Sequence, residues 1–318
     1  MIRYSFVIPH RDIPALLEKC VASIPRRDDV EIIVVDDCSA PSAELQELLD
    51  AFAAAGVCVI ADSSGKGAGH ARNLGVTAAK GEWLLFADAD DVFETDILAI
   101  LDSFRDAPLD LVLFKTQCRK QEDRREYGSR QAMCAQWNAM IDQLSAGSDD
   151  KYYRLMEDFV VPWGKMVRRQ FLLDHSIMFE NVPFSNDVVW SILVLIHLRR
   201  ERFACSGRLL YCVIDRPGSL SGNDTAEAFL CRSAVFFRKH AILEANGVPD
   251  MDPVNYPVYF RKAQSYGPCT LLKFWHLART MAKKIPPVYA VERRLRLRYP
   301  DLFVSVLFLQ SCWQRACR

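Results

Sequence analysis

The stretch of sequence that decides the fold is EWLLFADADD, residues 82–91. Four apolar residues at positions 83–86 are enough for one buried strand, and carboxylates follow at positions 88, 90 and 91. An uninterrupted apolar run of this kind predicts a central strand of a parallel sheet. Ligands of open α/β sheets bind just beyond the carboxyl ends of the strands. We therefore expect Asp88 and Asp90 to lie at a ligand site, close enough to share one cation.

Oxygen ligands of this kind suit Mg²⁺ or Mn²⁺, and these ions usually bind together with phosphate oxygens. A simpler interpretation of the same residues is an Asx-turn that ends the strand and caps a helix beginning near Glu94. The isolated motif does not decide between the two interpretations, and the residues that precede it favour the first.

The first 114 residues alternate between short apolar runs and helical segments, which is typical of a βαβ sheet. We expect strands at residues 4–8, 31–35, 57–61, 83–86 and 109–114, and helices near 13–23, 42–55, 68–79 and 94–104. Right-handed crossovers place the strand-to-helix turns along one edge of such a sheet. Four loops with polar residues therefore converge there, at 9–12, 36–39, 63–69 and 88–91. After about Lys115 the pattern becomes irregular, with a pair of strands near 203–205 and 209–214.

The formal net charge of zero conceals an uneven distribution of charge. From Asn255 onward the chain has 12 Lys and Arg against 2 acidic residues. Large apolar residues lie among these basic ones, as in amphipathic segments that bind anionic lipid. A solvated basic face on core-packing helices, or on helices that contact a second subunit, fits the same pattern. No nucleic-acid-binding motif accompanies the charge, so we expect no nucleic-acid partner.

The composition is that of an ordinary soluble enzyme, with 318 residues of which 50% are hydrophobic. The 11 cysteines include no C-x-x-C motif and none pairs with a histidine at zinc-ligand spacing, which favours a reducing compartment. The apolar part of residues 1–9 is too short for a signal peptide. The uncharged stretch at 302–314 is shorter than the roughly 20 residues that span a bilayer. We expect a cytoplasmic protein without a transmembrane segment.

Several motifs occur in a characteristic order. They are IPHRD at 8–12, IIVVDDCS at 32–39, GKGAGHARNLG at 65–75, DADD at 88–91, PWGKMVRR at 162–169, FSNDV at 184–188 and RPGSLS at 216–221. Together they resemble the family 2 glycosyltransferases of the GT-A fold over about the first 220 residues. The chain departs from the usual pattern in two places. Arg11 and Asp12 replace an aromatic residue and Asn, and Asn186-Asp187 replaces Glu-Asp.

The resemblance implies a GT-A, Rossmann-like α/β fold, with a mixed and mostly parallel sheet flanked by helices and a helical C-terminal extension. It implies a nucleotide-sugar-binding lobe at 1–114, an acceptor-binding lobe that completes the domain at 115–222, and a basic helical region at 223–318. The implied activity is transfer of a sugar from a nucleotide diphosphate sugar, with UDP-sugar as the expected donor. The acceptor would be a glycan or lipid-linked hydroxyl in the synthesis of a bacterial surface polysaccharide.

The resemblance also assigns the donor site. Asp90 resembles the residue that holds Mn²⁺ or Mg²⁺, and Asp88 the residue that contacts the ribose or the waters of the ion. Asp37 resembles the carboxylate that accepts a hydrogen bond from the uracil ring, and Pro9 would offer its carbonyl. Arg216 resembles the arginine of a loop that closes over the diphosphate, although an arginine in a turn is often only exposed.

Other residues of the motifs have less specific roles. Arg11 belongs to the first of the nucleotide-binding loops. Lys66 lies between two glycines at the start of a helix and could add charge near the phosphates, or be a solvated loop lysine. Trp163 and Lys165 are assigned to the acceptor side, although packing is the simpler role for Trp163. Arg72 is expected to lock its helix onto neighbouring loops, together with Asn73.

Asp187 is the candidate general base. It precedes an apolar helical segment and matches the carboxylate that takes the proton from the acceptor hydroxyl in the family. A single base without a second carboxylate favours one displacement step, which inverts the anomeric centre. The alternative role for Asp187 is that of a helix N-cap, which Ser185 or Asn186 could also provide.

Two other classes of protein fit part of the pattern. Residues 84–92 also match the start of a haloacid-dehalogenase-like phosphatase, in which Asp88 would be the nucleophile and Asp90 the acid/base. That motif normally opens its domain near the N-terminus. Here four expected strands precede its two carboxylates. The third class is a non-catalytic nucleotide-sugar-binding protein, which would have no need of Asp187 as a base.

Overall fold

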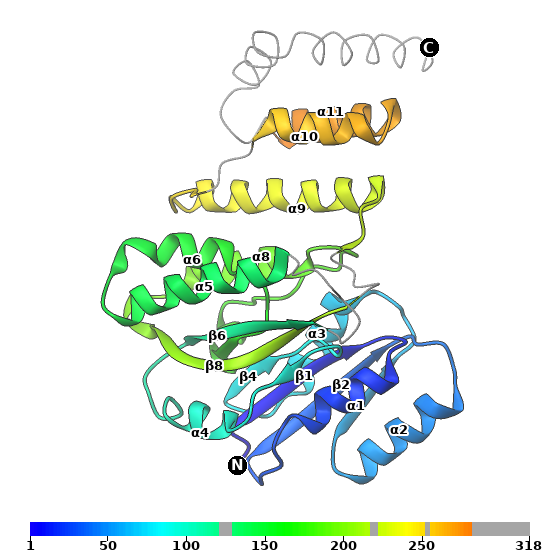
Figure 1. Ribbon diagram of the computed structural model, residues 1–318, viewed down its shortest axis with the longest axis vertical. Helices are drawn as coiled ribbons and strands as arrows, with labels where there is room; N and C mark the ends of the chain where they lie inside the picture. Colours follow the sequence, from blue (N-terminus) through cyan, green and yellow to red (C-terminus); the bar gives the residue numbers. More distant parts are fainter. Residues whose placement is uncertain (121–128, 217–221, 252–254, 282–318) are drawn as a thin grey trace. The chain divides into compact units, whose positions relative to one another are not determined.

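The computed structural model describes residues 1–120, 129–216, 222–251 and 255–281 (Figure 1). The chain divides into two compact units, with the boundary between residues 219 and 220. Residues 217–221 of the last motif, the uncharged stretch at 302–314 and most of the predicted basic segment lie outside the described residues.

The first unit is built on an eight-stranded sheet with the order β3-β2-β1-β4-β7-β6-β8-β5. Strands β1, β2, β3 and β4 are all parallel to one another, and β6 is parallel to β8. Strand β7 is antiparallel to both β4 and β6, and β5 is antiparallel to β8. The expected mixed, mostly parallel sheet is therefore confirmed. Its strands are β1 (Tyr4–His10), β2 (Val30–Asp37), β3 (Cys58–Asp62), β4 (Trp83–Phe86), β5 (Val92–Phe93), β6 (Leu111–Lys120), β7 (Lys165–Arg168) and β8 (Phe203–Asp215).

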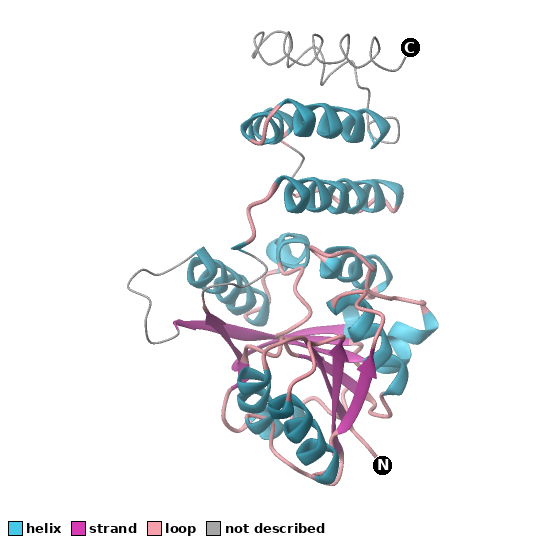
Figure 2. Ribbon diagram, turned by 90° about the vertical axis from the view of Figure 1, so that its right-hand side faces the viewer, coloured by secondary structure: helices cyan, strands magenta, loops and turns pink. Residues whose placement is uncertain are grey.

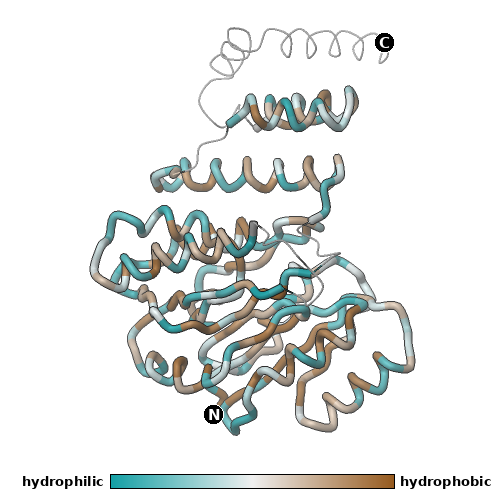
Figure 3. Tube along the Cα trace, in the orientation of Figure 1, coloured by the Kyte–Doolittle hydropathy of each residue, from teal (hydrophilic) through white to brown (hydrophobic). Residues whose placement is uncertain are grey.

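Helices cover both faces of this sheet (Figure 2). For this reason every residue of β1 and of β4 is buried, and the apolar run at 83–86 needs no polar alternation. Figure 3 shows the apolar residues concentrated along the central strands. The helices of the first unit are α1 (Pro14–Ala22), α2 (Ala43–Ala54), α3 (Ala68–Ala78), α4 (Ile97–Asp102), α5 (Ser129–Ser145), α6 (Tyr152–Asp158), α7 (Arg169–Asp174) and α8 (Asn186–His197), with 3₁₀ turns η1 (Asp149–Lys151) and η2 (Arg200–Arg202).

Two predicted elements are wrong in extent. The helix expected at 94–104 is only α4, because residues 92 and 93 pair with β8 and the N–H of Glu94 donates to the carbonyl of Leu210. Asp96 then adopts a left-handed conformation (φ 61°) before the helix begins. The strand pair expected at 203–205 and 209–214 is one continuous strand, β8, which absorbs the break as shifts of register against β6.

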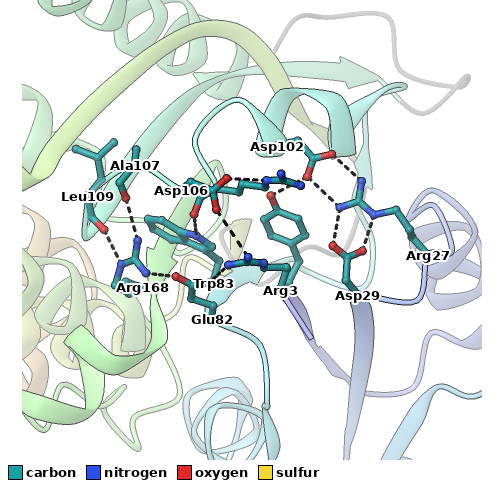
Figure 4. A network of polar contacts seen from close by, with 12 residues as sticks. Arg3, Arg27, Asp29, Glu82, Trp83, Asp102, Asp106, Ala107, Leu109 and Arg168 are labelled. Carbon is teal, nitrogen blue, oxygen red and sulfur yellow. Dashed lines mark hydrogen bonds and ion pairs between the residues drawn. The ribbon is translucent and has the colours of Figure 1, made fainter. Parts of the chain in front are cut away.

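A network of charged side chains fastens the amino ends of β1 and β4 (Figure 4). Arg168 donates to Glu82 and to the carbonyls of Leu109 and Ala107, and its guanidinium lies 4.2 Å from the centroid of the Trp83 ring. Because strands β1 and β4 run away from this network, their carboxyl ends lie at the opposite edge of the sheet. That edge carries the polar loops.

The second unit contains α9 (Ala226–Ala245), α10 (Tyr256–Ser265) and α11 (Pro268–Met281). The three helices share one buried aromatic cluster, which includes Phe229, Phe237, Phe260 and Phe274. Among the described residues, the helices lack the combination of length and hydrophobicity that crossing a bilayer requires.

Candidate active site

Three carboxylates gather directly after β4. Oxygen atoms of Asp88, Asp90 and Asp91 all lie within 4.8 Å of one another, which is a spacing that could hold a metal ion. Asp88 and Asp90 are partly exposed, whereas Asp91 is buried. The strand ends here because the carboxylates cannot continue into the core, so the expected position of Asp88 and Asp90 beyond a central strand is confirmed.

Asp91 is the member of this group that sequence analysis left without a role. Its carboxylate accepts from the Tyr211 hydroxyl at 2.9 Å and from the N–H of Ile214 at 2.8 Å, so it ties the loop to β8. Burial, together with the charges of Asp88 and Asp90, raises the pKa of Asp91 well above its usual range. The third carboxylate was visible in the motif, but nothing in the sequence indicated Tyr211 as its partner.

Tyr211 also holds the loop after β4 in place. Its hydroxyl accepts from the N–H of Asp88 at 2.9 Å while it donates to Asp91. The Trp163 ring is buried and stacks on the Tyr211 ring with centroids 5.3 Å apart. Trp163 therefore packs beneath the acidic loop. Its assignment to the acceptor side stays a prediction.

Arg216 lies against the D-x-D motif, which is Asp88-Ala89-Asp90. Its Nε donates to Oδ2 of Asp90 at 2.8 Å, and both side chains are only 18% exposed. Burial and the charge of Asp88 raise the pKa of Asp90, and the guanidinium of Arg216 opposes this rise. The structure thus places Arg216 beside the acidic residues, although the two are 126 positions apart in the sequence.

Arg72 connects the D-x-D motif to α8. The buried guanidinium donates to Asp88 at 2.6 Å through one terminal nitrogen and to Oδ1 of Asn186 at 2.7 Å through the other. Asn73 exchanges two hydrogen bonds of 2.9 Å with the backbone of Phe179. The expectation that Arg72 and Asn73 lock α3 onto neighbouring loops is confirmed.

Asp187 occupies the first turn of α8. The N-cap residue is Ser185. Its backbone is left-handed (φ 58°), and its side chain makes no capping hydrogen bond. Burial raises the pKa of Asp187, and the charge of Asp88 adds to the rise, while Arg72 and Lys165 lower it. Cations from α3 and β7 and a carboxylate of the acidic cluster after β4 therefore all act on Asp187.

Lys165 is enclosed in the protein at the start of β7. Its Nζ donates to the carbonyl of Phe159 at 2.7 Å and to Oγ of Ser191 at 3.1 Å. Burial lowers its pKa to about 7. The ammonium group is thus bound to the protein's own atoms, and its assignment to the acceptor side stays a prediction.

The candidate nucleotide-binding residues lie at the ends of β1 and β2. Asp37 is buried, and its Oδ1 accepts from the N–H of Gly67 at 3.1 Å. Nη1 of Arg11 lies 3.8 Å from Oδ2 of Asp37, with the Arg11 side chain half exposed. Pro9 is buried in β1 opposite Val35. Asp37 therefore joins the loop after β2 to the loop before α3.

Lys66 is exposed in that second loop, between Gly65 (φ 58°) and Gly67 (φ 92°). Residues with side chains rarely adopt such a backbone, so the two glycines are what allows the loop to turn sharply into α3.

A second polar network supports these loops, and sequence analysis missed it. His10 Nδ1 lies 2.7 Å from Oδ1 of Asp36, and its Nε2 accepts from the N–H of Ile13 at 3.1 Å. The hydroxyl of Ser39 donates to Asp36 and accepts from the N–H of Asp12 at 2.8 Å. The first acidic residue of the Asp36-Asp37 pair therefore holds two loops together, while the second faces the loop at Gly67.

The comparisons with known proteins agree with this geometry. The model of the family described as glycosyl transferase family 2 matches residues 5–175. The chain is similar to glycosyltransferase GlyG of Streptococcus pneumoniae, with 26% identity over 57% of this chain and 60% of that protein. It is also similar to glycosyltransferase EpsJ of Bacillus subtilis, with 25% identity over 68% of this chain and 62% of that protein. The chain thus spans about 60% of the length of these relatives.

Among solved structures, the fold is similar to residues 1–349 of TarS from S. aureus in complex with UDP-GlcNAc. The TM-score is 0.65 at 17% identity, and the match covers 99% of this chain and 92% of that one. The mixed sheet with an acidic loop after its fourth strand is thus that of a GT-A glycosyltransferase. The chain belongs to glycosyl transferase family 2.

Proposed function

We propose that this glycosyltransferase moves a sugar from a nucleotide diphosphate sugar, with UDP as the nucleotide, to a hydroxyl of a glycan or lipid-linked acceptor. The observation that carries the proposal is the bridge made by Arg72, which joins Asp88 to Asn186 in the first turn of α8, the turn that also contains Asp187. The UDP-GlcNAc named for the TarS complex supports UDP as the nucleotide.

A divalent cation fits the donor set at the end of β4. Asp90 would hold Mn²⁺ or Mg²⁺, with Asp88 as a second ligand or as a partner of its waters, since carboxylate oxygens are the ligands these ions prefer. A bound cation would supply charge stabilisation for the departing diphosphate. Arg216 already lies at Asp90 and would serve the same leaving group as a fork of N–H donors. Asp37, Pro9 and Arg11 would hold the nucleotide, and Lys66 would add charge beside the phosphates.

Asp187 would be the general base. Its carboxylate would take the proton from the acceptor hydroxyl as the oxygen attacks the anomeric carbon, and the sugar–phosphate bond would break on the opposite side. A single displacement of this kind inverts the anomeric centre. The raised pKa of Asp187 suits this role, because a carboxylate with a higher pKa is a stronger base and takes the proton more readily.

The region at 1–114 would bind the donor and the region at 115–222 the acceptor. The basic region at 223–318 would contact the membrane. The basic residues after Asn255 support peripheral contact with the inner face of a membrane, where a lipid-linked acceptor would be found. Oligomerisation through this region is the alternative. Family membership argues against the phosphatase, whereas a non-catalytic binding protein is separated from the proposal by the experiment below.

A panel of nucleotide sugars with Mn²⁺ or Mg²⁺ tests the proposal, with nucleotide release and thermal shift as readouts. A ligand at a hundredfold excess over its dissociation constant stabilises the native state by about 2.7 kcal/mol, so a donor that binds without turnover also registers. We expect stabilisation and nucleotide release with a UDP-sugar. Stabilisation without any turnover across a panel of acceptors would favour a binding protein. Hydrolysis of small phosphate esters would favour the phosphatase.

A further inference from the structure

Lys165 is a buried cation that the proposed chemistry does not yet use. Only 3% of the residue is exposed, and its Nζ is held between the carbonyl of Phe159 and the hydroxyl of Ser191. The rings of Phe159 and Trp190 lie 5.2 Å and 5.4 Å from the same nitrogen. Burying an ammonium group is costly unless nearby charge or hydrogen bonds compensate it.

The position of Ser191 relates this cation to the candidate base. Residues four apart on a helix lie on the same face, so Ser191 lies one turn beyond Asp187 on the same side of α8. Lys165 therefore contacts the helix within a turn of the carboxylate. Asp187 is the charged group whose field raises the pKa of Lys165 against the effect of burial.

The other charges around Asp187 come from two elements. Arg72 on α3 donates to Asp88 and Asn186, so its guanidinium is shared with the metal site. Asp88, in the loop after β4, repels the Asp187 carboxylate. Lys165 differs from Arg72 because its hydrogen bonds to Phe159 and Ser191 go to neutral groups. The charged group that acts on Lys165 is Asp187.

We propose that Lys165 is a positioning residue for the general base. Held by Phe159 and Ser191, its ammonium group supplies a fixed positive charge that stabilises the ionised form of Asp187. This inference rests on the proposed role of Asp187 as the base.

The pKa of Lys165 sets the pH range in which its charge can act on Asp187. With a pKa of about 7, Lys165 carries its charge at acidic pH. Removing the charge should therefore favour the protonated form of Asp187 and move its titration to higher pH. Arg72 and Asp88 are unchanged by such a substitution, so the difference between variants reports on Lys165.

The test is a titration that needs no substrate. The side-chain carboxyl carbons of aspartate are labelled with ¹³C and followed by NMR against pH, without added metal or nucleotide, and Asp187→Asn identifies the signal of Asp187. Lys165→Met removes the charge. Lys165→Gln also removes it but keeps a donor for the Phe159 carbonyl, in case the first variant does not fold. Ser191→Ala is the matched control, because it removes one contact of Lys165 and leaves the charge.

We expect both Lys165 variants to raise the midpoint of the Asp187 titration by about one pH unit, and Ser191→Ala to leave it near the wild-type value. The acid limb of the transfer rate should move by the same amount, whereas a merely structural role would lower the rate equally at every pH. An unchanged midpoint in both Lys165 variants, or an equal shift in Ser191→Ala, would overturn the inference. Full transfer activity in Asp187→Asn would overturn the proposed base instead, and would leave the titration result standing.

Discussion

Two of the three carboxylates at the end of β4 are each paired with an arginine. Asp90 is paired with Arg216 and Asp88 with Arg72, while buried Asp91 relies on a hydroxyl and a backbone N–H. Each carboxylate therefore has a different environment, although all three belong to one short motif. This difference makes it possible to test them separately.

Asp90 should be essential for the metal dependence of donor binding. Asp90→Ala removes the carboxylate that would hold the cation, so we expect transfer to be abolished and binding of UDP to become independent of Mn²⁺. Isothermal titration of UDP with and without Mn²⁺ measures this. Asp106→Ala, which removes an exposed carboxylate from the opposite edge of the sheet, is the control. Undiminished turnover in Asp90→Ala would exclude the D-x-D assignment.

Asp187 should separate binding from chemistry. Asp187→Asn keeps the shape of the side chain and removes its basicity, so we expect transfer to fall roughly 10²–10⁴-fold while donor affinity stays near that of the wild type. Steady-state transfer rates and donor titration on the same preparation give both quantities. A joint loss of donor affinity and folding would identify Asp187 as a structural residue of α8.

Lys165 should make stability depend on pH in the alkaline range. Its pKa is about 7 in the folded protein and about 10.5 when exposed, so between these values the unfolded chain binds one more proton than the folded one. The contribution of Lys165 to the free energy of unfolding therefore rises from about pH 7 to about pH 10.5 and is lost as the pH falls to 7. In Lys165→Met this rise should be absent. Urea denaturation at pH 7, 8.5 and 10 compares the two proteins, and parallel curves would contradict the prediction.

At the scale of elements, α3 must lie very close to the segment that precedes α8. A Cβ atom on Gly69 would come within 2.2 Å of the carbonyl oxygen of Glu180 and 3.0 Å of Cβ of Asn186. The glycine is thus required by close approach of two backbones rather than by an unusual φ. Its place next to Asn186 connects helix packing to the position of the base.

Gly69→Ala should therefore push α3 away from the segment before α8. We expect a loss of about 1–3 kcal/mol in the free energy of unfolding, as for other overpacked cores, and a lower transfer rate because Asn186 and Asp187 move together. Chemical denaturation and transfer assays measure the two effects. Gly207→Ala is the matched control, since a Cβ there would meet only Oδ1 of Asp142 at 3.8 Å. Equal stability of the two variants would show that the segment yields without cost.

At the scale of the whole molecule, the second unit limits how the basic segment can be tested. Helices α10 and α11 share the aromatic cluster of α9, so truncation after Val248 would expose Phe229 and Phe237. A loss of function in such a truncation would not distinguish lost membrane contact from a lost core. Substitution of charges in the full-length chain avoids this difficulty.

The full-length protein should bind vesicles that contain anionic lipid at low salt and dissociate at high salt. Each Lys or Arg near such a surface contributes about 1 kcal/mol before screening. Replacing Arg293, Arg294, Arg296 and Arg298 by Gln should therefore weaken binding strongly while donor binding is unchanged. Co-sedimentation with anionic and with neutral vesicles measures this. Absence of binding to anionic vesicles at low salt would leave the basic residues as a solvated face.

The sequence by itself determined a mostly parallel sheet, the positions of its first four strands along the chain and the place of Asp88 and Asp90 after the fourth. Apolar runs and turn residues are local signals, and a buried parallel strand shows as an unbroken apolar run such as residues 83–86. The family motifs added the identity of the candidate base. Local signals failed where a partner strand decided the outcome, as in the short α4 and the continuous β8.

Only the tertiary structure decided which residues become partners. Arg72 and Asn186 are 114 positions apart, and Arg216 and Asp90 are 126 positions apart. Nothing in the neighbourhood of either residue specifies such a pair, because the pairing depends on which strands lie side by side in the sheet. The same holds for burial. Lys165 follows a glycine in the motif at 162–169, and only the packing of Phe159, Trp190 and Ser191 around its ammonium group shows that this lysine is a buried cation.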